Sequence, residues 1–304
     1  MHIIALVLPL FAVIALGYVL KRTRFLGEDF PHRLNRLTYY VTLPVLLFLK
    51  TAAIDPSRMS YWPAAAGYPL IVLLTALLAM LAARAVAERT RGAFLQTAFR
   101  ANLAYLGLPI VSAAFGEATL PIVAVVIAVG VVINTVLSVG VLRIFAVEHA
   151  ERSLLQRVGD IARNPLIVSI VLGLAVAWLG VELPAMLADT LELVARMSLP
   201  SILLVIGFAL SFTRIGRNIG PTALASAVKL VIMPAIAYAV MRGVFHAEGD
   251  LLKTVVVLSA MPTAVVSQSF AKAFQADEGF TASTVSFDTL VSMVTVPLLI
   301  LLIG

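Results

Sequence analysis

The sequence predicts an all-α membrane protein with ten transmembrane helices. Of its 304 residues, 61% are hydrophobic and only 12% are charged, which is more apolar surface than a water-soluble core of this length can bury. Runs of about 20 apolar residues match a hydrocarbon layer of roughly 30 Å. Ten such runs occur, near residues 3–20, 36–54, 63–83, 93–115, 119–142, 164–181, 193–213, 221–242, 251–273 and 281–303.

The first of these runs differs from a secretory signal peptide. No basic segment precedes it, and its positive charges, Lys21, Arg22 and Arg24, follow it instead. We therefore expect the run to be retained as a transmembrane helix. The chain has no cysteine, which excludes disulfides, thiolate nucleophiles and zinc–thiolate sites.

The basic residues are distributed unevenly between the loops that join the runs. The odd-numbered loops hold 15 of the 22 Lys and Arg residues, the even-numbered loops hold 4, and Arg100, Arg196 and Lys229 fall within spans. The positive-inside rule then places the odd-numbered loops in the cytoplasm and both termini outside, on the periplasmic side of a cell membrane. The net charge of +6 is explained by these loops, so it does not indicate a nucleic-acid partner.

Proline and glycine positions recur between the two halves of the chain. The pairs separated by 156 residues are Pro9 and Pro165, Gly17 and Gly173, and Pro44 and Pro200. The pairs indicate a first five-helix repeat at residues 1–145, a cytoplasmic connecting loop at 146–163 and a second repeat at 164–304. Because five is an odd number of spans, the second repeat enters the membrane from the opposite side. Inverted repeats of this kind are typical of secondary transporters.

Spans four and nine each carry an internal proline. NLAYLGLPI contains Pro109, and LSAMPTAVVSQSF contains Pro262 at a corresponding place in the second half. Because proline removes a backbone hydrogen bond, we expect helix breaks at residues 107–109 and 261–262, near the middle of the membrane. Matched breaks in two inverted halves favour a substrate site there. The half-helices that begin at such breaks present unpaired amides and a partial positive charge, which suits an anion.

Several segments together resemble one family. They are NLAYLGLPIVSAAFGE, RLTYYVTLPVLLF, NPLIVSIVLGL, AMPTAVVSQSFAKAF and DTLVSMVTVP. They are similar to the auxin efflux carrier family, which includes plant auxin exporters and bacterial permeases for malonate, malate and other small acids. The resemblance implies a sodium/proton antiporter or bile-acid-symporter-like fold with broken, crossing helices four and nine, elevator-type movement and a homodimer. It also implies a substrate site at Asn102, Gly107, Pro109 and Pro262.

The residues around the two prolines include candidate donors to a small organic anion. Amide groups come from Asn102 and Gln268, and hydroxyl groups come from Tyr105, Thr263, Ser267 and Ser269. The alternative for each of them is packing between helices, where such residues form interhelical hydrogen bonds. Asn102 is favoured over the others because it belongs to the family motif.

Three ionisable residues within spans are candidates for coupling or electrostatic roles. Asp288 and Lys229 lie at matching depths in spans ten and eight, so Asp288 either pairs with Lys229 or carries a coupling proton. Arg100 precedes Asn102 and either holds an anion or extends to the headgroups. Arg196 follows Glu192 by four residues, which predicts a structural ion pair on one helix face.

The motifs of membrane-embedded enzymes do not occur, so we expect no enzymatic activity, no metal site and no cofactor. The four histidines never pair on one helix, and neither a Gly-x-Ser-x-Gly elbow nor a Walker phosphate loop is found. The sequence therefore predicts a secondary carrier of a small organic anion in the lipid bilayer. Two alternatives stay open: a sodium-coupled symporter of the bile-acid type, and a channel or sensor on a transporter scaffold. The acid, the direction and the coupling ion also stay open.

Overall fold

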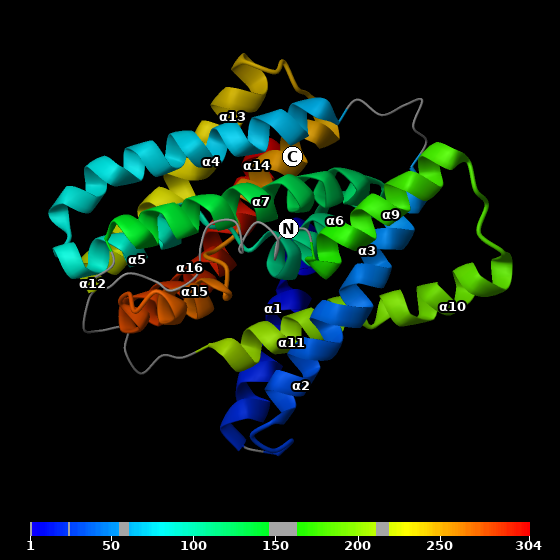
Figure 1. Cartoon of the computed structure of the whole chain (residues 1–304), viewed down its shortest axis with the longest axis horizontal. Coiled ribbons are helices and arrows are strands. Elements are labelled where there is room, and N and C mark those ends of the chain that lie inside the picture. Colours follow the sequence, from blue (N-terminus) through cyan, green and yellow to red (C-terminus); the bar gives the residue numbers. More distant parts are fainter. Residues whose placement is uncertain (1, 24, 55–60, 146–162, 211–218) are drawn as a thin grey trace.

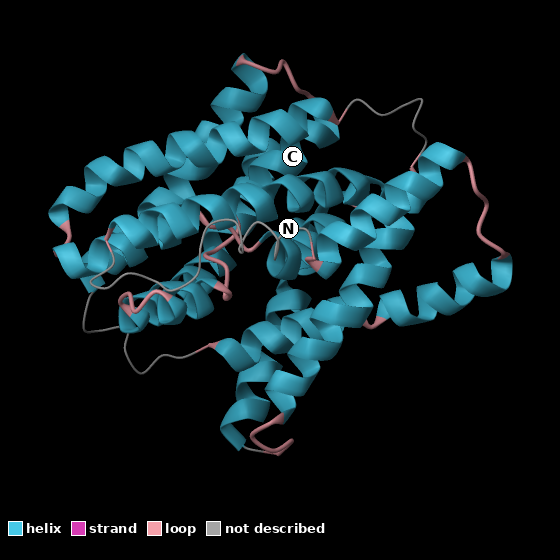
Figure 2. Ribbon diagram, viewed as in Figure 1, coloured by secondary structure: helices cyan, strands magenta, loops and turns pink. Residues whose placement is uncertain are grey.

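The structure is a computed structural model that describes residues 2–23, 25–54, 61–145, 163–210 and 219–304. Helices are the regular elements of these ranges, none of which contains a strand (Figures 1 and 2). The expected connecting loop at 146–163 lies outside the described residues except for Arg163.

The helices of the first half are α1 (His2–Thr23), α2 (Phe30–Leu37), η1 (Thr38–Thr42), α3 (Leu43–Ala52), α4 (Trp62–Ala82), η3 (Ala83–Ala85), α5 (Glu88–Phe99), η4 (Leu103–Gly107), α6 (Leu108–Phe115), η5 (Glu117–Thr119) and α7 (Leu120–Ile144). Those of the second half are α9 (Pro165–Leu179), α10 (Ala185–Arg196), α11 (Ser198–Ala209), α12 (Ile219–Ala227), η7 (Val228–Ile232), α13 (Met233–Gly243), α14 (Gly249–Ser259), α15 (Ser267–Ala273) and α16 (Glu278–Ile303).

Five helical stretches of the described chain are long and apolar enough to cross a membrane. They are Trp62–Ala85, Glu117–Ile144, Ala185–Ala209, Ile219–Gly243 and Glu278–Ile303. The other five predicted ranges are mostly helical, but 93–115 and 251–273 are each interrupted. Large apolar side chains, among them Leu77, Leu81 and Leu302, are exposed on the outside, where lipid would cover them. The predicted class, an all-helical multi-pass membrane protein, is thereby confirmed.

Two pairs of helices pack closely through glycine. A Cβ atom on Gly207 of α11 would lie 2.1 Å from the carbonyl oxygen of Ile14 and 2.8 Å from the Cα of Gly17, both in α1. On Gly173 of α9 it would lie 2.0 Å from Oγ1 of Thr51 in α3, and Figure 1 shows α3 and α9 side by side. Gly17 and Gly173, which the sequence paired at an interval of 156 residues, thus occupy close contacts of the same kind.

Three wide helical turns each precede a proline. The turns η1, η4 and η7 run into Pro44, Pro109 and Pro234, each the second residue of the helix that follows. In each turn the amide just before the proline donates to the carbonyl five residues earlier instead of four. A proline ring clashes with the carbonyl four residues before it, and a wider turn moves that carbonyl aside. The helix therefore continues through each of these prolines.

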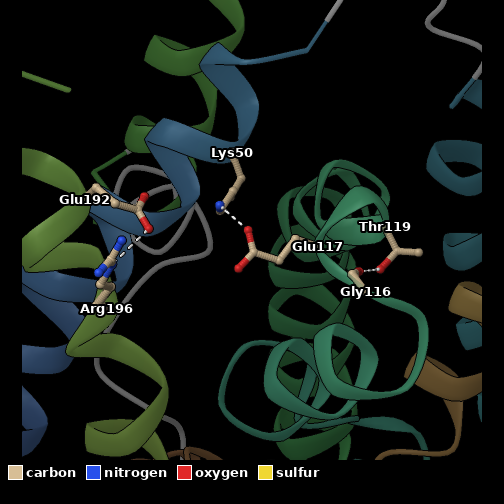
Figure 3. A network of polar contacts seen from close by, with 6 residues as sticks. All are labelled: Lys50, Gly116, Glu117, Thr119, Glu192 and Arg196. Atoms are coloured by element: carbon tan, nitrogen blue, oxygen red, sulfur yellow. Dashed lines mark hydrogen bonds and ion pairs between the residues drawn. The ribbon is translucent and has the colours of Figure 1, made fainter. Parts of the chain in front are cut away.

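Two ion pairs lie near one another in Figure 3. Arg196 Nε lies 3.5 Å from Glu192 Oε1 on α10, which confirms the pair predicted from their spacing. Lys50 Nζ at the end of α3 lies 2.6 Å from Glu117 Oε2 in η5. The second contact joins the end of α3 to η5, so these two segments lie together.

Candidate functional site

Two helices of the fold are interrupted, and the interruptions pair with each other. The helix α5 ends before residues 100–102, and α14 ends before residues 260–266. The amide of Asn102 donates to the carbonyl of Pro262 at 2.9 Å, and the amide of Ala264 donates to the carbonyl of Arg100 at 2.9 Å. Backbone groups freed at membrane depth are thus satisfied by protein. We call the paired segments 100–102 and 260–266 the crossover.

The first interruption lies upstream of the expected position. The sequence predicted a break at residues 107–109, but the chain is helical there and is extended at residues 100–102 instead. Pro109 fits because it is the second residue of α6, where its missing amide costs little. The second interruption contains Met261 and Pro262, as predicted.

The half-helices that begin at the crossover satisfy some of their first amides within the chain. The first amides of α15 already donate to the carbonyls of residues 264–266. At η4 the amide of Tyr105 donates to the side chain of Asn102 at 3.3 Å, and those of Leu106 and Gly107 donate to the carbonyl of Asn102. The amides of Ala104, Val265 and Val266, three residues that line the cavity, have no hydrogen-bond partner among the described residues, so the helix ends still offer free donors to an anion.

A cavity of about 960 Å³ lies against the crossover. It is bounded by α2, η4, α7, α11 and the start of α15, and the predicted residues Arg100, Asn102 and Tyr105 line it. Ser269, a predicted donor, lines it as well. The hydroxyl of Tyr105 donates to Oδ1 of Asn35 at 2.7 Å, which ties η4 to α2.

Six other predicted residues lie outside the lining of this cavity. They are Gly107, Pro109, Pro262, Thr263, Ser267 and Gln268. Gly107 has a packing role, since a Cβ atom there would lie 2.6 Å from Cδ2 of Leu258. The Oγ of Ser267 and the Nε2 of Gln268 are buried without a hydrogen-bond partner in the described structure.

Sequence reasoning did not find several residues that line the cavity. Among them are Asn35 and Tyr39 from the second span, Asn164 at the start of α9, and Phe270 of α15. Asn35 and Tyr39 are four residues apart and so share a helix face, and Tyr39 stands in the segment RLTYYVTLPVLLF. The others are brought to the cavity only by the packing of distant segments.

Arg100 supplies the buried positive charge of the cavity. Its side chain is only 6% exposed, and Nη1 donates to the carbonyl of Asn134 at 3.1 Å and to Oγ of Ser138 at 2.7 Å. The guanidinium carbon lies 4.2 Å from the ring centre of Phe270, a cation–π contact. None of the described residues that line the cavity is acidic, and the other arginine of the lining, Arg36, is exposed at the rim.

Asp288 and Lys229 lie behind the crossover, outside the cavity lining, and bind different partners. The carboxylate of Asp288 accepts hydrogen bonds from the hydroxyls of Ser226 and Thr263, the latter at 2.5 Å. The ammonium of Lys229 donates to the carbonyl of Ser259 at 2.6 Å. Lys229 therefore places its positive charge at the carboxyl end of α14, which carries a partial negative charge. Asp288 places its negative charge at the segment that follows, where it accepts from Thr263.

The comparisons with known proteins agree on one family. A family model described as "Membrane transport protein" matches residues 2–300. A Rhizobium meliloti protein named "Putative malonate transporter" is 25% identical over 310 residues, covering 99% of this chain and 96% of its own. "Auxin efflux carrier component 5" of Arabidopsis thaliana is 25% identical over 333 residues, covering 96% and 93%. An uncharacterized transporter of Methanothermobacter thermautotrophicus is 26% identical over 300 residues, covering 96% and 95%. These matches confirm the resemblance predicted from the sequence motifs.

Proposed function

Because the chain belongs to the membrane transport protein family, we propose that it is a secondary carrier of a small organic anion. The substrate is a mono- or dicarboxylate or an auxin-like acid, bound in the cavity at the crossover. One observation carries the proposal: the cavity holds the buried guanidinium of Arg100 and, among its described lining residues, no carboxylate. A carboxylate substrate supplies the negative charge that this lining lacks.

The proposed architecture has ten spans in two inverted repeats, 1–145 and 164–304, within one structural unit. The matched close contacts of Gly17 and Gly173 support it. Contacts between segments on the same predicted side of the membrane support it as well. Thr90 donates to Asp277 at 2.9 Å next to odd-numbered loops, and Lys50 pairs with Glu117 next to even-numbered loops. In this proposal the crossover and the helices that contain it move as an elevator against the remaining helices. The protein is a homodimer in the inner membrane, with both termini outside.

Proton coupling through Asp288 belongs to the same proposal. Asp288 is fully buried and bonds to Thr263 of the crossover, so a change in its charge acts on the segment next to the substrate. The described cavity lining has no acidic residue for a sodium ion, which makes the bile-acid type of symport the weaker alternative.

Uptake into proteoliposomes tests the function. The purified protein is offered labelled malonate, malate, pyruvate and indole acetate, each with and without a proton or a sodium gradient. We expect saturable uptake of at least one acid, stimulated by the proton gradient. Uptake of cations without any acid of this panel would contradict the anion assignment, and non-saturable flux would indicate a channel.

A further inference from the structure

The described helices pack into two units. The first, which we call the support unit, consists of α1, α2, η1, α3, α9, α10 and α11, and it contains the close contacts at Gly207 and Gly173. The second, which we call the crossover unit, consists of the helices from α4 to α7 and from α12 to α16, and it contains both interruptions. An elevator movement slides one unit along the other. Contacts that join the units therefore differ between the two end states of the movement.

The cavity opens toward the odd-numbered loops. Its exposed lining residues His32 and Arg36 lie next to the first loop, and Asn164 and Ala209 lie next to the fifth and the seventh. None of the described residues that line the cavity is next to an even-numbered loop. This conformation is therefore open on the odd-loop side and closed on the even-loop side.

On the closed side an ion pair joins the two units. Lys50 Nζ, in the last turn of α3, lies 2.6 Å from Oε2 of Glu117, which is in the turn between α6 and α7 (Figure 3). The turn has a defined shape: Gly116 has a φ of 84°, which favours glycine, and the hydroxyl of Thr119 donates to the carbonyl of Gly116 at 2.7 Å. The turn thus holds the carboxylate of Glu117 toward α3.

We propose that Lys50 and Glu117 form a latch on the even-loop side, which favours the conformation with the cavity open to the odd-loop side. The inference rests on the elevator movement of the proposed function. Movement of the crossover unit toward the even-loop side carries Glu117 away from α3, and a hydrogen-bonded pair does not survive a separation of a few ångström.

The latch is weak enough to open during transport. The Lys50 and Glu117 side chains are 20% and 70% exposed, so the pair has the strength of an ion pair at a surface. A pair of this kind changes the ratio of two conformations by about two- to five-fold. It therefore biases the side that the cavity faces without preventing the movement.

Labelling of a single cysteine measures which side the cavity faces. The chain has no cysteine, so Val131→Cys places one thiol in the cavity lining. Proteoliposomes of determined orientation are treated with a membrane-impermeant maleimide from one side or the other. We expect fast labelling from the odd-loop side and slow labelling from the even-loop side. Lys50→Gln and Glu117→Gln, each in this background, should raise the rate from the even-loop side about two- to five-fold. Unchanged rates in both variants would overturn the latch.

An exchange of the two charges separates the ion pair from other effects of substitution. Lys50→Glu alone should label from the even-loop side at least as fast as Lys50→Gln, and its combination with Glu117→Lys should return the rate to near the wild-type value. The matched control is Glu192→Gln, which breaks the neighbouring pair with Arg196 inside the support unit and should leave both rates unchanged. A combined variant that labels as fast as Lys50→Glu would overturn the pairing.

A covalent link tests whether the two positions separate during transport. Lys50→Cys combined with Glu117→Cys is treated with a short bifunctional maleimide, which should stop acid uptake. Glu192→Cys combined with Arg196→Cys receives the same treatment and should keep its uptake, because both positions are on α10. Undiminished uptake by protein linked between positions 50 and 117 would overturn the latch.

The outcomes separate this inference from the function on which it rests, because the labelling uses no substrate. Unchanged labelling in the latch variants together with uptake of an acid overturns the latch and leaves the carrier assignment intact. The expected labelling without uptake of any acid in the panel supports the latch and overturns the assignment.

Discussion

The hydroxyl oxygen of Thr263 lies 2.5 Å from Oδ2 of Asp288 and 2.7 Å from the carbonyl oxygen of Thr97. A hydroxyl carries one hydrogen, so it can donate to only one of these two acceptors at a time. Ser226 is placed in the same way, between the carbonyl of Thr222 and Oδ1 of Asp288. A proton on Asp288 lets the carboxyl group donate to one of these hydroxyls, which is then free to donate to its backbone carbonyl. The network thus has a place for the coupling proton proposed for Asp288.

Replacement of Asp288 by asparagine should remove the response to a proton gradient. The amide has nearly the shape of the carboxyl group; its NH2 group can donate to one of the two hydroxyls and its oxygen can accept from the other, so the fold should be retained. The measurement is acid uptake into proteoliposomes with and without a proton gradient. Asp277→Asn is the matched control, because Asp277 caps the start of the same helix, where it accepts from the amide of Phe280 at 2.9 Å. Full gradient dependence in Asp288→Asn would rule out the proton role.

The hydroxyl of Thr263 should matter for stability because it joins the two interrupted helices. Thr263→Val keeps the shape but removes the hydrogen bond to the carbonyl of Thr97 and the donor to Asp288. Loss of a buried partner costs about 1–3 kcal/mol. Thermal unfolding of the purified protein in detergent should therefore show a lower midpoint for the valine variant. Thr263→Ser keeps the hydroxyl and should lie closer to the wild type; an unchanged midpoint in both would contradict the role of this bond.

The positions of the helices could be predicted because bilayer thickness fixes their length. The first interruption could not be predicted from local sequence. Prolines indicated residues 107–109, but a wide turn accommodates Pro109, as similar turns accommodate Pro44 and Pro234. Residues 100–102 contain no proline, and they are extended because they pair with residues 260–266. That pairing joins segments more than 150 residues apart, which only the folded chain brings together.

The candidate site shows the same limit. Arg100, Asn102 and Tyr105 lie in one segment, so one motif was enough to find them. Phe270 and Asn164 reach the cavity from other helices, and neither stands in a pattern that marks it as a site residue. The polar residues of LSAMPTAVVSQSF were placed in the site because they follow Pro262, but most of them face the interior behind the crossover.

The close contact between α1 and α11 gives a prediction about packing. Gly207→Ala would place a Cβ atom 2.1 Å from the backbone oxygen of Ile14, so the two helices must separate. Backbone cannot move aside as a flexible side chain can, and overpacking of this kind costs about 1–3 kcal/mol or more. We expect a lower unfolding midpoint and a smaller yield of monodisperse protein in size-exclusion chromatography.

Gly140→Ala is the control for that substitution. Gly140 is in the helix α7, and nothing lies within 4 Å of the position that its Cβ atom would occupy. Alanine favours a helix over glycine by roughly 1 kcal/mol, so this variant should be as stable as the wild type or more stable. Equal loss of stability in both variants would show that packing against α1 is not the cause.

The role of Asn102 in binding can be separated from its role in the fold by Asn102→Asp. The Asn102 side chain accepts the amide hydrogen of Tyr105 and so caps the helix that starts there, and an aspartate caps equally well. Its charge, however, would stand in the cavity two residues from Arg100 and would compete with the substrate for the guanidinium. We expect an unchanged unfolding midpoint and an apparent affinity for the acid that is at least about ten-fold weaker. Asn102→Ala, which removes the cap without adding a charge, should instead lower the midpoint by the equivalent of about 1 kcal/mol. Wild-type affinity in the aspartate variant would place the substrate away from Asn102 and Arg100.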